Sequence, residues 1–422
     1  MEVKTILSLL GLEYTNLEVD NTILEDENAY IIYAKLKLPS KRECPHCHSN
    51  NVVVDDKKIV TIKFSVVFHS NKPIYLRLTK TRFKCKNCNK KFVQTIDNLI
   101  RRNHQISNDL CWKISYLSKQ IVTFKFIAES LNLSVPTVIT IFDEITKVKR
   151  KPLTKVLCID EKRFNTYNSK FICILSNGLT GGILDILPSR RKEYLFDYFA
   201  SFSELELNRV KFFCSDMFEG YKTIKKNFFK NAIHIIDHFH IKKLFIETIQ
   251  TIRKREMKKY EKTSLIYRTL KSKRKIFLID ITKNKYRNSY FDYNGELIDS
   301  IEEARRIIVK CDEFYEIYML YLDFCSCIGF ERSKNELEVN LNFIIDKCLS
   351  STSKEIIKIG STLFDFFDEI INTFSYVNEY HISNSVAEGN NNYISTLLKI
   401  SYGIKDFNRL RKRLLIAKKS EG

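Results

Sequence analysis

Three acidic residues occupy positions where a carboxylate could hold a divalent cation. Asp160 ends the apolar run "KVLCID" and Asp216 ends "VKFFCSD", whereas Glu388 is the single acid in "SNSVAEGNNN". Carboxylate oxygens are ligands that Mg²⁺ prefers, and two ions held about 4 Å apart can assist an in-line phosphoryl transfer. The acids therefore predict a site for two Mg²⁺ or Mn²⁺ ions, provided that the fold brings all three together.

Two pairs of cysteines predict a second metal site. Cys44 and Cys47 form one Cys-x-x-Cys pair, Cys85 and Cys88 form another, and four thiolates can close a tetrahedral structural Zn²⁺ site. The 37 residues between the pairs exceed the usual spacing. However, "IVTIKFSVVFH" and "IYLRLTKTRFK" alternate as a hairpin does, which predicts a zinc ribbon. The alternative is two redox or incidental pairs. The other eight cysteines indicate reduced core thiols.

The elements that must position the first two acids lie between residue 155 and about residue 250. Apolar runs and helical spacing predict the order β-β-β-α-β-α-β-α, which is the RNase H-like topology. Its first and fourth strands are neighbours, so Asp160 and Asp216 would meet despite the 55 residues between them. Either acid alone would more simply be a turn or cap residue.

Glu388 requires a helix that begins near Ser383. A polar face and an apolar face alternate at helical spacing, and we expect the apolar face to pack on the sheet. The polar face contains Asn384, Glu388, Asn391 and Ser395, and the apolar face contains Val386, Tyr393, Ile394, Leu397 and Leu398. Glu388 would then be the third metal ligand, although in isolation it would read as a solvated helix acid. Residues of about 245–380 become a mainly helical insertion.

A helix-turn-helix is predicted within residues 96–150, with an ordinary helical hairpin as the alternative. Apolar residues at helical spacing predict two short helices, and Ser134 is a plausible N-cap for the second. The apolar set is Ile127, Ala128, Leu131, Leu133, Val138, Ile139 and Phe142. A second helix of this kind enters the major groove of DNA. The predicted DNA contacts are Ser134, Val135, Thr137, Thr140, Lys147, Lys149 and Arg150.

Charge and composition favour a polyanionic partner. The 422 residues contain 70 Lys and Arg against 50 Asp and Glu, a net charge of +20, and 44% are hydrophobic. The alternative is a Lys-rich surface that reflects codon usage. Arg253 to Lys275 is a basic stretch that could be a solvated helix face or a surface that tracks phosphates. No apolar run approaches the length of a membrane span, so we expect no membrane partner and a cytoplasmic protein.

The order of these blocks resembles the ISL-three family of bacterial insertion-sequence transposases. The likeness rests on "VLCIDE", "FCSDMFEGYKTIKKNFFKNAIHIIDHFHIKKL" and "SNSVAEGNNNYISTLLKISYGIKDFNRLRKRLL". It implies a DDE transposase in which Asp160, Asp216 and Glu388 match the catalytic acids. Asp237 and His240 match an Asp-x-x-His element, and His240 would stabilise the scissile phosphate, position water or serve only as a structural histidine.

The resemblance also implies a domain order and a biological role. We expect a segment of unknown role at 1–40, a zinc ribbon at 41–95, the helix-turn-helix at 96–150 and an RNase H-like domain at 151–422. The protein would bind terminal inverted repeats, cut DNA and join it to target DNA as a homodimer or larger assembly at the bacterial nucleoid. The alternatives are an inactive relative that regulates by binding DNA, and an RNase H-like nuclease or Holliday-junction resolvase.

Overall fold

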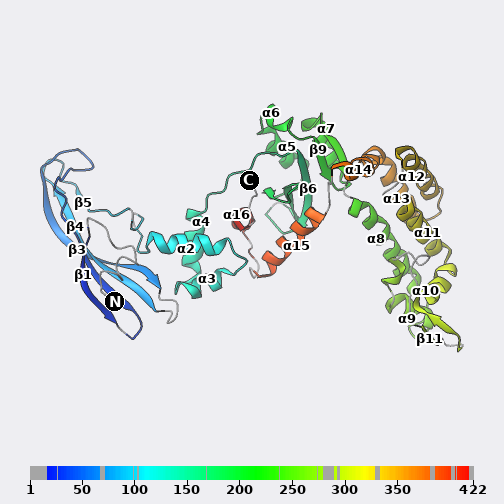
Figure 1. The fold of residues 1–422 in the computed structure, drawn as a ribbon, viewed down its shortest axis with the longest axis horizontal. Coiled ribbons are helices and arrows are strands. Elements are labelled where there is room, and N and C mark those ends of the chain that lie inside the picture. The colour runs from blue at the N-terminus through cyan, green and yellow to red at the C-terminus, as the bar shows by residue number, and fades with distance from the viewer. Residues whose placement is uncertain are drawn as a thin grey trace. The chain divides into compact units, whose positions relative to one another are not determined.

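Figure 1 shows the computed structural model as a ribbon. The chain divides into two compact units. The structure describes residues 17–25, 27–66, 72–97, 99–101, 104–167, 169–236, 238–272, 274–278, 289–291, 295–327, 333–380, 385–400, 404 and 406–417. Residues up to Lys149 form the first unit together with Ile394–Lys419, and Arg150–Tyr393 form the second. The single domain predicted over 151–422 spans parts of both units.

A five-stranded sheet forms one half of the first unit. Its strands are β1 (Leu17–Glu25), β2 (Tyr30–Leu36), β3 (Val52–Val66), β4 (Pro73–Cys85) and β5 (Lys91–Val93). The predicted hairpin is confirmed, because β3 and β4 pair antiparallel from Val52↔Cys85 onward. The strand order is β1-β2-β4-β3, with β5 on β4, and β2 pairs β4 in parallel. Part of the segment of unknown role thus extends the ribbon's own sheet.

Among the described residues, four helices lie wholly within the first unit. They are α2 (Asn108–Ser118), α3 (Phe124–Ser130), α4 (Val135–Ile145) and α16 (Phe407–Ala417). The predicted N-cap is confirmed, because the Ser134 hydroxyl accepts the Thr137 N–H. Ile141 is buried, whereas Ile139, which the apolar pattern included, is only half-buried.

The C-terminal helix α16 is tied to α3 and α4 by two arginines. Arg409 donates to Asp143 at 2.6 Å. Arg413 is fully buried, donates to the carbonyls of Gln120 (3.2 Å) and Val122 (2.6 Å), and lies 4.8 Å from the ring centre of Phe124. The most C-terminal described helix therefore completes a bundle made otherwise of residues 108–145.

A second five-stranded sheet is the centre of the second unit. The strands are β6 (Val156–Arg163), β7 (Phe171–Asn177), β8 (Ile183–Leu187), β9 (Phe212–Ser215) and β10 (Ile233–Ile236). The helices between them are α5 (Lys192–Ala200), α6 (Glu204–Leu207) and α7 (Glu219–Phe228). The strand order is β10-β9-β6-β7-β8. The predicted adjacency of the first and fourth strands is confirmed, since β6 pairs β9 in parallel. One detail differs, because β6 continues three residues past Asp160 while pairing with β7.

Helices dominate the rest of the second unit. The elements are α8 (His238–Met257), α9 (Leu265–Ser272), η1 (Ile276–Leu278), β11 (Ser289–Phe291), β12 (Leu297–Asp299), α10 (Ser300–Val309), α11 (Asp312–Cys327), α12 (Lys334–Leu349), α13 (Lys354–Asp365) and α14 (Phe367–Tyr380). They share one apolar core that includes Phe245, Phe314 and Phe324. Some residues of the basic stretch from Arg253 to Lys275 make contacts within the second unit. Arg253 is buried and donates to the Leu270 carbonyl, and Arg255 pairs with both Glu313 and Glu355.

Helix α14 covers the outer edge of the sheet at β10. The Thr373 hydroxyl accepts the Ile236 N–H at 2.9 Å and donates to the Ile236 carbonyl at 2.8 Å. The Asn372 amide donates to the His234 carbonyl at 3.2 Å. These side chains replace the ladder that a further strand would supply, so the edge strand keeps its backbone partners.

The described residues contain no single helix that is both long and apolar enough to cross a membrane. One bent pair, Phe124–Ser130 with Val135–Ile145, passes by combined length and composition, with 107° between its helices.

Candidate active site and metal centre

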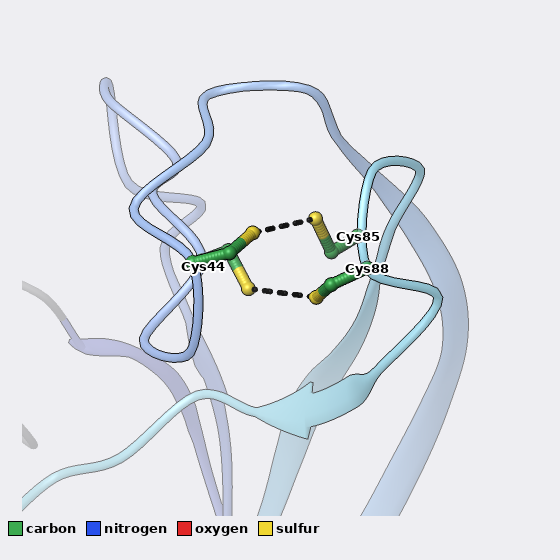
Figure 2. Close-up of side chains that lie close together, drawn as sticks. Cys44, Cys85 and Cys88 are labelled. Carbon is green, nitrogen blue, oxygen red and sulfur yellow. Dashed lines mark hydrogen bonds between the residues drawn. The ribbon is translucent and has the colours of Figure 1, made fainter.

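The four predicted cysteines converge at one end of the β3–β4 hairpin (Figure 2). The Sγ atoms all lie within 4.8 Å of one another, and those of Cys44 and Cys88 are 3.6 Å apart, as are those of Cys47 and Cys85. A tetrahedral Zn²⁺ with bonds of about 2.3 Å places its sulfurs about 3.8 Å apart, whereas a disulfide requires about 2.05 Å. The cluster therefore fits a structural Zn²⁺ ion.

Both cysteine pairs are held by the same kind of turn. The residue after the second cysteine has a left-handed backbone in each, with φ of 58° at His48 and 58° at Asn89. The backbone N–H of Cys88 lowers the pKa of the Cys85 thiol to about 6, against the opposing effect of burial. A low thiol pKa favours the thiolate that binds metal. The ring of His48, in the first of these turns, lies 2.6 Å from the Glu43 carboxylate.

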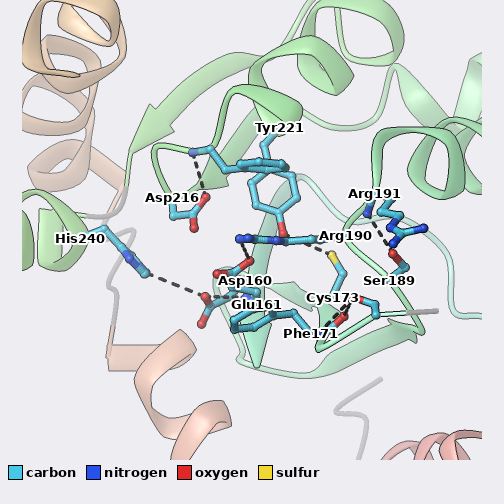
Figure 3. A network of polar contacts seen from close by, with 12 residues as sticks. Asp160, Glu161, Phe171, Cys173, Ser189, Arg190, Arg191, Asp216, Tyr221 and His240 are labelled. Carbon is cyan, nitrogen blue, oxygen red and sulfur yellow. Dashed lines mark hydrogen bonds and ion pairs between the residues drawn. The ribbon is translucent and has the colours of Figure 1, made fainter. Parts of the chain in front are cut away.

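Asp160 and Asp216 are brought together by the register of two parallel strands (Figure 3). Cys158 of β6 pairs with Cys214 of β9, and each aspartate stands two residues beyond its cysteine. Side chains alternate along a strand and neighbouring strands lie about 4.8 Å apart, so both carboxylates lie on the same face. Asp216 also accepts the Phe218 N–H at 3.1 Å, in the turn that leads into α7.

The electrostatics around Asp216 fit a cation site. Burial, together with the neighbouring Glu161 and Asp160 carboxylates, raises the pKa of Asp216 to about 7. Buried acids that repel one another are stabilised by a divalent cation placed between them. These two aspartates therefore fit a site for Mg²⁺ or Mn²⁺.

Sequence reasoning missed two charged residues beside these acids. Glu161 forms an ion pair with Arg190, which follows β8. The Arg190 guanidinium lies 4.8 Å from the ring centre of Phe171 and 4.8 Å from that of Phe218. Two aromatic faces and a carboxylate hold this cation next to the aspartates. In the sequence, the only local signal for this ion pair was the position of Glu161 directly after Asp160.

His240, in the first turn of α8, faces the same acids. Its Nε2 atom lies 3.8 Å from the Asp160 carboxylate. Burial lowers the pKa of His240, although Asp160 opposes this effect. The structure thus brings three predicted site residues together, namely Asp160, Asp216 and His240. Asp237 lies outside the described residues.

Glu388 belongs to the first turn of α15 (Ser385–Ile400), but its side chain lies outside the described residues, as does residue 384. The boundary between the two compact units falls inside this helix, after Tyr393. Ile394 and Leu397 were expected to pack on the sheet. Both are fully buried and both group with the first unit, so their packing on the sheet stays a prediction.

Two protein families match this chain. The profile of a transposase family, ISL3, matches residues 157–414, which is more than half of the chain. The zinc-finger of transposase IS204/IS1001/IS1096/IS1165 matches residues 40–88, which include all four cysteines. The chain belongs to the ISL3 family of DDE transposases. No curated protein matches it.

The predicted DNA contacts of this ISL3 transposase lie on α4 and after it. Thr140 is exposed, Val135 and Thr137 are half-buried, and the Ser134 hydroxyl lies 2.7 Å from that of Thr137.

The basic residues after α4 differ in their surroundings. Lys147 and Lys149 are exposed. Arg150 pairs with Glu206 at 3.0 Å, and its guanidinium lies 3.8 Å from the ring centre of Phe202. Arg150 is therefore anchored within the second unit.

Proposed function

We propose that this ISL3 transposase binds the terminal inverted repeats of an insertion sequence, cuts the DNA at their tips and transfers the freed 3′ ends to target DNA. The observation that carries the proposal is the register that brings the half-buried Asp160 and Asp216 onto one face of the sheet. The strand order β10-β9-β6-β7-β8 supports an RNase H-like assignment for the second unit. The helices of about 245–380 would be an insertion into that domain.

Asp160, Asp216 and Glu388 would hold Mg²⁺ or Mn²⁺ in this proposal. When bound, two such ions would activate the attacking oxygen and stabilise the leaving oxygen in an in-line phosphoryl transfer. His240 is half-buried beside Asp160, and its lowered pKa favours the neutral ring, which can donate to a phosphate oxygen or orient water. Arg190 supplies a fixed positive charge at the same face. Asp237 is assigned to this site by its family motif alone.

The first unit would recognise the DNA. Helices α3 and α4 support a helix-turn-helix in which α4 enters the major groove and presents Ser134, Val135, Thr137 and Thr140. The acids of α4 are already neutralised, because Asp143 pairs with Arg409 and Glu144 with Arg101. Lys147 and Lys149 would contact phosphates, and Arg150 would contribute less because Glu206 holds it. The zinc ribbon over 41–95 would stiffen this unit.

Transposition joins two ends of one element, so we propose a homodimer or larger assembly on DNA. An enzyme with this substrate would act at the nucleoid, in the bacterial cytoplasm.

The test is metal-dependent cleavage of DNA that carries the sequences flanking this reading frame. Asp160→Asn, Asp216→Asn and Glu388→Gln should each lower cleavage by at least about 10³-fold, because each removes a proposed metal ligand. DNA binding, measured by gel shift, should remain. Glu193→Gln, which neutralises an exposed acid of α5, is the matched control and should cut normally.

Two results would change the assignment. Normal cleavage by Glu388→Gln would remove this residue from the site. Specific binding by the native protein without cleavage under Mg²⁺ or Mn²⁺ would favour a regulator that binds DNA.

A further inference from the structure

A positively charged pocket lies at the outer edge of the sheet in the second unit. A pocket of about 480 Å³ opens between α7, β10 and α14, and four lysines line it. The lysines are Lys222, Lys225, Lys226 and Lys230. The acids in the lining are Asp368 and Glu369. Positive charge therefore exceeds negative charge by two in this pocket when histidine is neutral.

Three of the lysines are available to a ligand. Lys222 is engaged, since its ammonium lies 3.0 Å from the Glu369 carboxylate and donates to the Asp365 carbonyl at 2.6 Å. Lys225, Lys226 and Lys230 form no ion pair with any other residue in the described part of the chain. Lys226 and Lys230 are also exposed. This concentration of unneutralised charge is what a phosphate requires.

One ring nitrogen of a buried histidine in the same lining lacks a hydrogen bond. His234 is 5% exposed, and its Nε2 atom lies 2.9 Å from the Ser215 hydroxyl. That hydroxyl donates to the Asp216 carbonyl, so Nε2 is the donor, and Nδ1 of the neutral ring is an acceptor. Nδ1 has no hydrogen-bond partner within the described structure and lies 3.6 Å from Glu369. A water molecule or a lysine ammonium can satisfy this acceptor, whereas a phosphate oxygen cannot.

The pocket and the acids lie on opposite faces of the sheet. His234 pairs with Phe213 of β9, whose side chain packs with Tyr221 of α7. Asp160 and Asp216 follow Cys158 and Cys214, which pack together on the other face. Because side chains alternate along a strand, a phosphate in the pocket would be a contact separate from the one at the acids.

We propose that this lysine pocket binds a backbone phosphate of the element-end DNA, apart from the acid site. The proposal rests on the DNA-cutting function above and extends it, because it assigns a second contact for the substrate within the catalytic unit. Lys225, Lys226 and Lys230 would hold the phosphate, while Lys222 remains with Glu369.

The experiment compares the full-length protein with Lys225→Gln/Lys226→Gln on duplex DNA from the element end. The control is Lys354→Gln/Lys358→Gln, which removes the same charge from an exposed face of α13. The pocket variant should reduce the slope of log affinity against log salt by about 1 for each lysine that contacts a phosphate. The control should keep the native slope. Lys230→Gln, outside any helix, should also lower the slope and guards against misfolding of α7.

The outcomes separate this proposal from the function on which it rests. If the native protein neither binds nor cuts the duplex, the proposed function fails. If it binds and cuts but the pocket variant matches the control, the pocket proposal alone is overturned. Inorganic phosphate distinguishes the ligand source. If millimolar phosphate raises the melting temperature of the native protein but not of the variant, while DNA affinity is unchanged, the pocket binds a free phosphate and not DNA.

Discussion

At the scale of single residues, Glu369 shows how a buried acid can be made stabilising. Burial alone would raise its pKa, but the contacts with His234 and Lys222 outweigh that effect and lower the pKa of Glu369 to about 2. Burial also lowers the pKa of His234, so Lys222 is the charged partner at pH 7. The folded protein therefore favours the carboxylate more strongly than the unfolded chain does.

This shift predicts a pH dependence of stability. A lowered acid pKa contributes stability above the unfolded value of 4.5, and that contribution is lost as pH falls from 4.5 toward 2. Its size is about 1–3 kcal/mol at pH 7. Glu369→Gln should lower the free energy of unfolding at pH 7. It should also reduce the slope with which that free energy falls as the pH becomes acidic. Urea unfolding between pH 3 and 7 measures this, and equal slopes for the two proteins would contradict it.

Several site residues were predictable because their signals are local. Asp160 and Asp216 follow buried apolar runs, and Ser134 stands where a hydroxyl caps a helix. Arg190 was not predictable, because its partners Glu161, Phe171 and Phe218 are separated in the sequence. In addition, most arginines in proteins are exposed to solvent.

At the scale of elements, α16 could not be placed from the sequence. Its basic residues indicate an exposed amphipathic helix, whereas its partners lie almost 300 residues earlier in the chain. The parallel pairing of β2 with β4 was missed for the same reason, since no turn joins the two strands. The β3–β4 hairpin was predictable, because its alternation and its cysteine pairs are adjacent in the sequence.

Arg413 makes the placement of α16 testable. Arg413→Ala removes two hydrogen bonds from a charged donor and the contact with Phe124, so it should cost about 3 kcal/mol. Asn408→Ala changes an exposed position of the same helix and should stay within about 0.5 kcal/mol of the native protein. Chemical unfolding followed by circular dichroism gives both values. Equal stability of the two variants would mean that α16 does not dock as described.

At the scale of the whole molecule, the two compact units should unfold separately, and zinc should affect one of them. Metal analysis should find one Zn²⁺ per chain, and Cys85→Ser should reduce it. Calorimetry should resolve two transitions. A chelator should lower only the transition of the first unit, because a metal stabilises the fold that binds it. One transition that shifts as a whole, or a protein without zinc, would contradict this prediction.

The bundle of α2, α3, α4 and α16 also governs how the protein can be made. Phe407 leaves the ribosome more than 250 residues after Ile145, a delay of about 10–50 s at common translation rates. Helices α2, α3 and α4 therefore lack their partner α16 while the second unit is synthesised. A gene copy with a premature stop codon yields fragments that carry these helices without Arg413. Such fragments would compete poorly with intact transposase for the ends of the element.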